Sequence, residues 1–149
     1  MSGVLTEIVA QEGVVLSVLM YLKNGRINDA AACFAEKFEF MDRGIGLEFK
    51  DSERLGEFFR KTSELYPDSS LQTDTILVSG NYVITEWTLR TALRVPFYGE
   101  PSRKVSVSVH GVSIVRIENG KITRWSDYYD GLASRRTALS SYFTEWVEP

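Results

Sequence analysis

The pattern of hydrophobic and polar positions changes its period about halfway along the chain. In residues 4–23 apolar side chains recur three and four positions apart, which is the spacing of one side of a helix. From residue 71 onward apolar and polar residues alternate, as they do in a half-buried strand. The change predicts helices in the first part of the chain and a sheet in the second.

Capping and breaking residues divide the first part into three helices. Asn24-Gly25 ends the first helix, because glycine suits the left-handed cap. Asn28 begins the second, and Asp51 or Ser52 begins the third, which stops before Pro67. The predicted elements are a helix over 4–23, a helix over 28–36, a short strand over 37–42, a loop over 43–46 and a helix that ends at residue 64.

Turn residues divide the second part into four strands. Gly80-Asn81 and Glu118-Asn119-Gly120 are typical of tight hairpin turns. The polar segment 96–103 contains glycine and proline and indicates a longer loop. The tail, residues 131–147, is predicted to be helical. The predicted strands are 71–79, 82–95, 104–117 and 121–130.

Helices followed by consecutive strands are typical of the α+β class. A length of 149 residues fits one domain, so we expect a single domain over residues 1–149. We expect the three N-terminal helices to pack on one face of a curved antiparallel sheet, with a helical tail at the C-terminus. A sheet wrapped on its helices in this way forms a cone-shaped α+β barrel with an apolar pocket at its mouth.

Strand alternation predicts which side chains face the pocket. In 83–95 and 105–117 the odd-numbered positions are the drier ones, so they should face the helices. Trp125, Asp127 and Tyr129 share this inner face in the last strand. An aspartate between two aromatic side chains loses hydration, which should raise its pKa. The side chains expected to line the pocket are Tyr21, Phe40, Trp87, Leu89, Val109, Ser113, Trp125 and Tyr129.

Composition narrows the function classes. Seventeen Lys and Arg against twenty Asp and Glu give a net charge of −3, which argues against a nucleic-acid binder. A single cysteine, Cys33, and a single histidine, His110, argue against a disulfide framework and a metal site. We see no apolar run near the roughly 20 residues that cross a bilayer, and Glu7 and Glu12 replace the basic start of a secretory signal. We therefore expect a cytoplasmic domain that binds neither nucleic acid nor membrane.

Asp42 and Asp127 are the candidate catalytic residues. Two carboxylates in an apolar pocket can divide their roles, one ionised as a base and the other protonated as an acid. Asp42 adjoins Arg43 and a glycine-rich loop, so we expect it to be the wetter, ionised member. Such a pair needs no cofactor to remove a proton beside a carbonyl, to close a ring or to add water. Alternatively, Asp42 caps a turn and Asp127 pairs with an arginine.

Two segments carry a family resemblance. They are DAAACFAEKFEFMD, which ends at residue 42, and GVSIVRIENGKITRWSDYYD at 111–130. Both resemble the nuclear-transport-factor-2-like superfamily, in the SnoaL-like branch that includes polyketide cyclases. The chain is also similar to limonene-1,2-epoxide hydrolases and, more distantly, to ketosteroid isomerases. The resemblance implies the cone-shaped fold over nearly the whole chain. It also implies a homodimer through the outer sheet face, here with Tyr82, Ile84, Val112 and Ile114.

The resemblance assigns roles to individual residues. Asp42 matches the aspartate that shuttles the proton in the isomerases, and Asp127 matches the water-activating aspartate of the epoxide hydrolases. Trp87 and Leu89 stand where the hydrolases carry an arginine and an aspartate. Ser113 stands where the isomerases carry a protonated aspartate. The resemblance thus implies aspartate chemistry, with the acid that opens an epoxide replaced.

We favour a cofactor-independent enzyme of isomerase or cyclase type, which uses aspartate acid/base chemistry on a small apolar carbonyl or polycyclic compound. One alternative is an epoxide hydrolase with altered acid residues. Another is a non-catalytic dimeric domain that binds a small ligand, since a fold does not fix a function. An enzyme requires a pocket that reaches both carboxylates, whereas a non-catalytic domain predicts a pocket filled by Trp87, Trp125 and Phe40.

Overall fold

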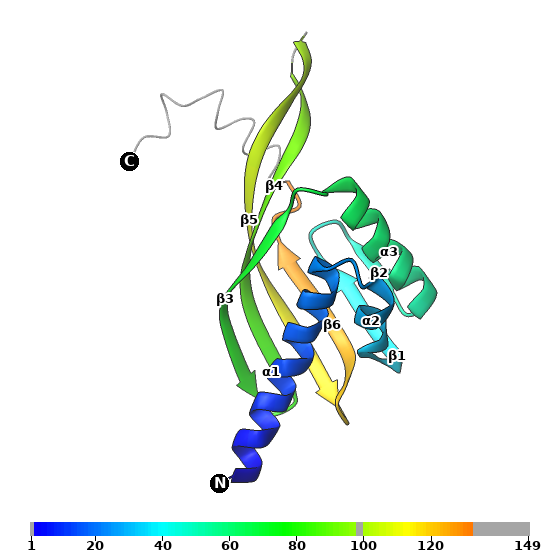
Figure 1. Ribbon diagram of the computed structural model, residues 1–149, viewed down its shortest axis with the longest axis vertical. Coiled ribbons are helices and arrows are strands. Elements are labelled where there is room, and N and C mark those ends of the chain that lie inside the picture. The colour runs from blue at the N-terminus through cyan, green and yellow to red at the C-terminus, as the bar shows by residue number, and fades with distance from the viewer. Residues whose placement is uncertain (1, 98–99, 133–149) are drawn as a thin grey trace.

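The structure is a computed structural model that describes residues 2–97 and 100–132. Within this part of the chain three helices lie against one face of a six-stranded sheet, which confirms the α+β cone (Figure 1). The helices are α1 (Ser2–Lys23), α2 (Ile27–Ala32) and α3 (Ser52–Leu65). The strands are β1 (Phe34–Asp42), β2 (Leu47–Phe49), β3 (Ser70–Ser79), β4 (Tyr82–Phe97), β5 (Glu100–Glu118) and β6 (Lys121–Tyr129).

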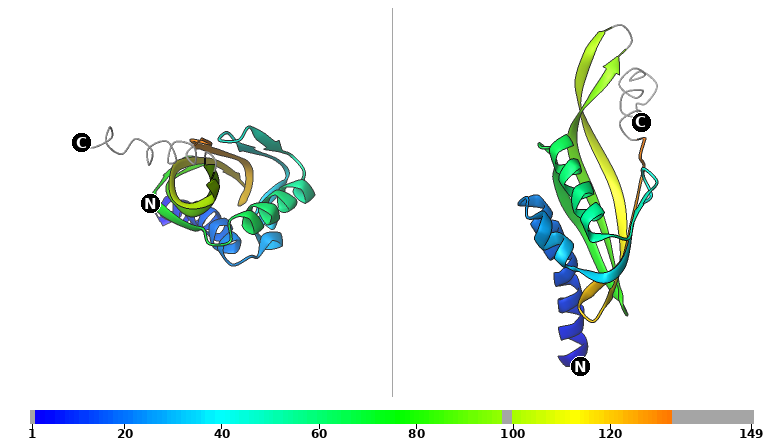
Figure 2. Two further views of the ribbon diagram at one scale, coloured as in Figure 1. Left: turned by 90° about the horizontal axis from the view of Figure 1, so that it is seen from above. Right: turned by 90° about the vertical axis from the view of Figure 1, so that its right-hand side faces the viewer.

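The sheet is mixed, with strand order β2-β1-β6-β5-β4-β3. Strands β3 to β6 form the predicted antiparallel meander. The expectation of an antiparallel sheet throughout is wrong, because β1 pairs with β6 in parallel. Alternation along a strand predicts its faces but carries no information on the direction of its partner. Figure 2 shows the twist of the sheet and the long β4–β5 hairpin, which extends beyond the helices.

Several element boundaries differ from the prediction. Helix α2 ends at Ala32 and β1 begins at Phe34, because pairing of Phe34 with Ile122 draws the segment into the sheet. Strands β4 and β5 continue into the predicted 96–103 loop, since their cross-strand pairing extends that far. Strand β2 is too short to show alternation and was not predicted. Apart from the turn at 131–132, the predicted tail helix lies outside the described residues.

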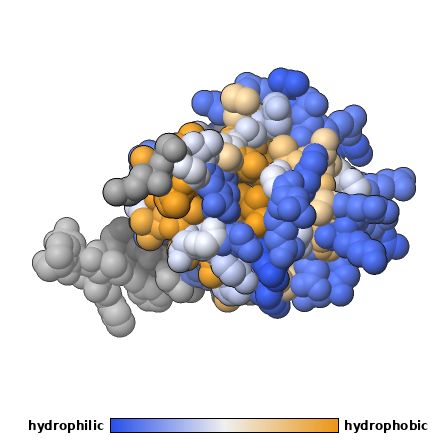
Figure 3. All heavy atoms as spheres, turned by 90° about the horizontal axis from the view of Figure 1, so that it is seen from below, coloured by the Kyte–Doolittle hydropathy of each residue, from blue (hydrophilic) through white to orange (hydrophobic). Residues whose placement is uncertain are grey.

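Helix α1 is longer and more apolar than expected. Gly3–Lys23 has the length and composition of a helix that could cross a membrane, so the expectation that no run approaches this length is wrong. The core helix of a globular domain can share these properties, and Val15 and Val18 of α1 are buried in the core, but only 17 % of the apolar window of α1 is buried. The first turns of α1 extend beyond the sheet (Figures 1 and 2). Figure 3 shows apolar side chains gathered on this end of the molecule. The exposed apolar side chains of α1 include Val4, Leu5 and Val9 in its first turns.

The core lies between the helices and the sheet face that they cover, which we call the inner face. The predicted odd-numbered side chains point into it: Val83, Trp87, Val115 and Trp125 are buried. Aromatic rings from β1, α3 and β6 pack together there, with ring centroids 5.1–6.4 Å apart. Such offset and edge contacts stabilise a core beyond the area that they bury. These rings are Phe34, Phe38, Phe40, Phe59 and Trp125.

Gly111 should be intolerant of a side chain. A β-carbon at this position would overlap the indole of Trp87, which is buried. We expect Gly111→Ala to lower the free energy of unfolding by about 1–3 kcal/mol, as overpacking does. Gly13→Ala is the control, because a β-carbon there meets no atom within 4 Å and should stabilise α1 by about 0.5–1 kcal/mol. Urea unfolding measures both changes, and a Gly111→Ala variant as stable as wild type would contradict this account.

Candidate active site

A row of polar side chains crosses the inner face of the sheet. The register pairs Thr85 of β4 with Ser113 of β5, Ser113 with Asp127 of β6, and Asp127 with Asp42 of β1. Registered partners on neighbouring strands point to the same face, so these four side chains lie side by side. The parallel entry of β1 therefore brings the two predicted aspartates together, although 85 residues separate them in sequence.

Two donors hold Asp127 in place, and a third holds one of these donors. Ser113 Oγ donates a hydrogen bond to Asp127 Oδ1 at 2.5 Å, and Trp125 Nε1 donates to the same oxygen at 2.6 Å. Trp87 Nε1 in turn donates to Ser113 Oγ at 2.9 Å. Among the described residues both bonds to this carboxylate reach Oδ1. Oδ2 has no hydrogen bond to a described residue.

Burial raises the pKa of Asp127 from 3.8 to about 6. The hydrogen bonds from Ser113 and Trp125 lower this pKa, but by less than the loss of hydration raises it, and the negative charge of Asp42 raises it further. The predicted direction of the shift is confirmed. In the described part of the chain the partners of Asp127 are a hydroxyl and an indole, not the arginine of the alternative hypothesis.

Asp42 is 6 % exposed, so the expectation that it is the wetter carboxylate is wrong. Strand β2 covers β1 on its other side, and Asp42 lies inside the sheet, not at its edge. Its Oδ1 accepts a hydrogen bond from the Ile45 backbone N–H at 3.1 Å, and its Oδ2 accepts one from the Tyr129 hydroxyl at 3.0 Å. Asp42 therefore closes the turn after β1, as the alternative proposed, and also orients Tyr129. Burial and the bond to Asp42 raise the pKa of Tyr129.

The structure brings most of the predicted pocket residues to this row. Trp87, Ser113, Trp125 and Tyr129 bond to the two aspartates or to their partners. The ring of Phe40 stacks on that of Trp125. Leu89 and Val109 pair with each other one step further along the inner face, and both are partly exposed.

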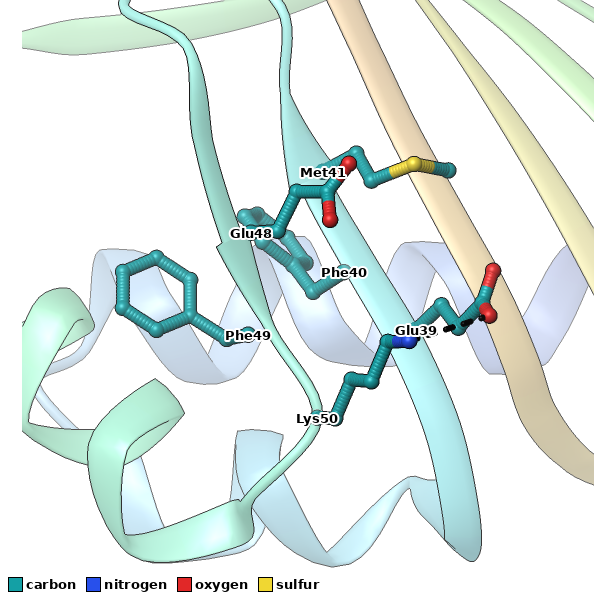
Figure 4. A pocket seen from close by; sticks show the side chains of 6 residues that line it. All are labelled: Glu39, Phe40, Met41, Glu48, Phe49 and Lys50. Atoms are coloured by element: carbon teal, nitrogen blue, oxygen red, sulfur yellow. Dashed lines mark ion pairs between the residues drawn. The ribbon is translucent and has the colours of Figure 1, made fainter.

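Tyr21 is placed elsewhere. It lines a groove of about 440 Å³ between α1, α2 and the β5–β6 turn, together with Cys33 and Lys121. A smaller hollow of about 110 Å³ lies at the β1–β2 edge, where Lys50 and Glu39 form an ion pair of 3.7 Å (Figure 4). Neither hollow includes Asp42 or Asp127.

Large side chains fill the inner face beside the row. Trp87, Trp125 and Phe40 are 7 %, 4 % and 3 % exposed, which is the filling predicted for a non-catalytic domain. Asp127 and Tyr129 nevertheless keep part of their surface accessible, as do Leu89 and Val109 beyond Trp87. The described inner face is therefore not completely closed at these residues.

Two glycines shape the site, and neither role was predicted from the sequence. Gly111 lies under the indole of Trp87, and a β-carbon at Gly44 would overlap the ring of Tyr129. The available signal was Gly111 in the interior of a strand, which often marks the close approach of another group.

The sequence profile of the SnoaL-like domain matches residues 18–125. This range covers more than half of the chain, including Asp42, Thr85 and Ser113, and Asp127 follows just after its end. The chain belongs to the SnoaL-like family. No curated protein sequence matches it.

Solved structures show the same fold in other SnoaL-like proteins. A candidate SnoaL-like polyketide cyclase from Jannaschia sp. CCS1 is 18 % identical, with a TM-score of 0.73 over 87 % of this chain and 91 % of that one. IdmH from Streptomyces antibioticus, a candidate polyketide cyclase, is 14 % identical, with a TM-score of 0.73 over 87 % and 98 %. A ketosteroid isomerase-like protein from Catenulispora acidiphila, bound to trimethylamine, is 17 % identical, with a TM-score of 0.71 over 85 % and 92 %. The TM-scores establish the shared fold, and at these identities the likeness shows the fold alone.

The raised pKa predicts how the stability of this SnoaL-like domain depends on pH. The folded state binds the Asp127 proton more tightly than the unfolded state, so protonation of Asp127 stabilises the fold. This contribution is complete below about pH 3.8 and is lost as the pH rises through about 6. The asparagine of Asp127→Asn cannot ionise. At pH 8 the free energy of unfolding of this variant should therefore exceed that of wild type by up to about 3 kcal/mol. The difference should shrink towards pH 4.

Urea unfolding at the two pH values measures this difference. Glu86→Gln on the exposed outer face is the control and should keep the wild-type pH dependence. An Asp127→Asn variant that is less stable than wild type at pH 8 would show that burial does not dominate at this carboxylate.

Proposed function

We propose that this protein is a cofactor-independent enzyme that uses Asp127 as an acid/base catalyst on a small apolar carbonyl or polycyclic compound, in an isomerisation or ring closure. The observation that carries the proposal is the desolvated carboxylate of Asp127, which is held on one oxygen and has a pKa of about 6, in a residue that keeps part of its surface accessible. A base is most effective when its pKa lies near the working pH. The candidate polyketide cyclases among the structural relatives support the same class.

The chemistry begins with proton abstraction. Asp127 Oδ2 takes a proton from the carbon beside a carbonyl group, and the electrons of the C–H bond form an enolate. The enolate then attacks a second carbonyl carbon of the same molecule to close a ring, or takes the proton back at another carbon to give an isomer. Asp127 returns its proton in either case, so no external co-reactant is consumed.

Asp42 supports this step without touching the substrate. Both of its oxygens accept hydrogen bonds from the protein, so it is not free to act as the acid of the predicted pair. Its negative charge strengthens proton binding at Asp127, and its bond to the Tyr129 hydroxyl fixes the ring beside that carboxylate. Asp42 is therefore a positioning residue in this proposal.

The surroundings of Asp127 indicate the kind of substrate. Leu89 and Val109 offer hydrocarbon surface on the accessible side, and Tyr129 offers an aromatic ring. Such a surface fits a neutral, largely apolar molecule, because a charged one would lose hydration without gaining a partner. The acidic C–H group must supply the reactivity.

The epoxide hydrolase alternative lacks an acid. Trp87 uses its N–H on Ser113, and Leu89 is a hydrocarbon, so neither can protonate the leaving oxygen of an epoxide. A limonene-type epoxide should therefore remain unhydrolysed. Rapid diol formation that is lost in Asp127→Asn would favour an epoxide hydrolase over an isomerase or cyclase.

Hydrogen exchange at carbon tests the proposed enzyme. In D₂O, wild type should accelerate exchange of the acidic C–H of a fused-ring aryl ketone such as 1-tetralone, followed by proton NMR. The rate should rise with pH through about 6 as Asp127 ionises. Asp127→Asn should reduce the rate at least about 10²-fold, the usual contribution of a general base.

Two further variants complete this experiment. Asp42→Asn should reduce exchange by less than Asp127→Asn does, because Asp42 acts only through its charge and its bond to Tyr129. Glu86→Gln on the outer sheet face should retain the wild-type rate. Wild-type exchange in Asp127→Asn would exclude Asp127 as the base. The absence of exchange in wild type across a panel of apolar ketones would favour the non-catalytic, ligand-binding domain.

We also propose a homodimer through the outer face of the sheet. Leu77, Ile84 and Ile114 pair in register across β3, β4 and β5 on this face and form an apolar strip. Leu77 is 58 % exposed, and Tyr82 and Tyr128 on the same face are exposed as well. Contiguous exposed apolar surface of this kind favours burial against a partner, and a second copy presents a matching strip.

Sedimentation tests the assembly at micromolar concentration. Wild type should sediment at twice the chain mass of 16.9 kDa, and Ile114→Glu in the middle of the strip should shift it towards the single chain. Ser108→Glu, at an exposed position on the same face, is the control and should leave the dimer intact. Wild type that sediments only at 16.9 kDa would exclude the dimer.

A cytoplasmic location, without membrane or nucleic-acid partners, belongs to the same proposal. Two acidic residues, Glu7 and Glu12, interrupt the apolar composition of α1, and Val15 and Val18 pack into the core. The protein used for sedimentation should accordingly come from the soluble fraction of the cell. Recovery only from membranes would overturn this part of the proposal.

A further inference from the structure

A chain of hydrogen bonds ends on Asp127 and begins at an indole that the proposed chemistry does not use. Trp87 Nε1 donates to Ser113 Oγ at 2.9 Å, and Ser113 Oγ donates to Asp127 Oδ1 at 2.5 Å. A serine hydroxyl has a single hydrogen to donate. Because the indole N–H occupies an acceptor position of Ser113, the hydroxyl hydrogen is directed at the carboxylate.

The indole that begins this chain is fixed. Trp87 is 7 % exposed, its ring lies against the backbone of Gly111, and the ring of Tyr129 packs 5.9 Å from it between centroids. Its N–H therefore keeps its direction towards Ser113. Together with the bond from Trp125, this arrangement anchors Oδ1 of Asp127 from two sides.

We infer that Trp87 and Ser113 are positioning residues, which hold Oδ1 of Asp127 and set how readily that carboxylate binds a proton, so that Oδ2 is the oxygen that reacts. The reacting role of Oδ2 rests on the proposed function. The effect on proton binding needs no substrate and can be measured on the protein alone.

Removal of either donor in this series of hydrogen bonds should shift the pKa of Asp127 in a known direction. A hydrogen bond donated to a carboxylate favours its ionised form, so removal of the Ser113 hydroxyl should strengthen proton binding at Asp127. Trp87 acts through Ser113, because without the indole N–H the hydroxyl is free to turn away. Removal of the N–H should therefore have the same sign and a smaller size.

Thr85 provides a matched control. It is the registered neighbour of Ser113 on the same face and is fully buried, but its Oγ1 has no hydrogen-bond partner among the described residues. Thr85→Val thus deletes a buried hydroxyl at the adjacent position of the row without touching the chain from Trp87 to Asp127. If a deletion acted by loosening the core, Ser113→Ala and Thr85→Val would both change the pKa of Asp127. If it acts by removing a specific donor, only Ser113→Ala should change it.

Titration of the aspartate carboxyl carbons by ¹³C NMR, on the full chain without substrate, tests the inference. Wild type should show a midpoint for Asp127 near 6. Ser113→Ala should move it upward by about one pH unit, the size expected for one hydrogen bond to a charged group. Trp87→Phe should move it upward by less, and Thr85→Val should leave it in place. Ser113→Thr, which keeps a hydroxyl, should restore the wild-type midpoint.

An unchanged midpoint in Ser113→Ala would overturn the inference, and so would an equal shift in Thr85→Val. If Ser113→Ala fails to fold, the Trp87→Phe titration decides, because this variant keeps an aromatic ring in the core. Failure of the proposed function is distinguishable. A shifted midpoint combined with normal carbon exchange in Asp127→Asn would retain the positioning role and reject Asp127 as the base.

Discussion

The parallel pairing of β1 with β6 is the interaction on which the site depends. It inserts a strand from the N-terminal part of the chain beside the last strand of the meander and sets Asp42 opposite Asp127. Without this pairing the row of polar side chains would end at Asp127 on β6, and Tyr129 would lose the acceptor that orients it. The same pairing carries Phe34 and Phe40 into the aromatic core, so the fold and the site rest on one set of backbone hydrogen bonds.

Burial of Asp127 disfavours the ionised form that the proposed chemistry requires. Ser113 and Trp125 partly compensate with hydrogen bonds to one oxygen. A folded state selected for stability alone would place a hydrocarbon or a neutral amide at such a position. A carboxylate that keeps one oxygen unengaged by the described residues is instead suited to exchange protons near neutral pH.

The filling of the inner face sets a limit on what can react there. Trp87 and Trp125 serve two purposes, since their rings exclude water from the core and their N–H groups enter the polar network. This dual use explains how a nearly closed core can surround the carboxylate of Asp127.

The alternation of residues by itself determined the α+β class, the inner and outer faces of the long strands and the burial of Asp127, because each of these follows from local periodicity. It did not determine the end of α2, the length of the β4–β5 hairpin or the direction of β1, because these depend on partners distant in sequence. The placement of Tyr21 away from the aspartates and the deep burial of Asp42 have the same origin. Periodicity indicates which face of a helix or strand is apolar, whereas only the tertiary structure decides which apolar faces pack together.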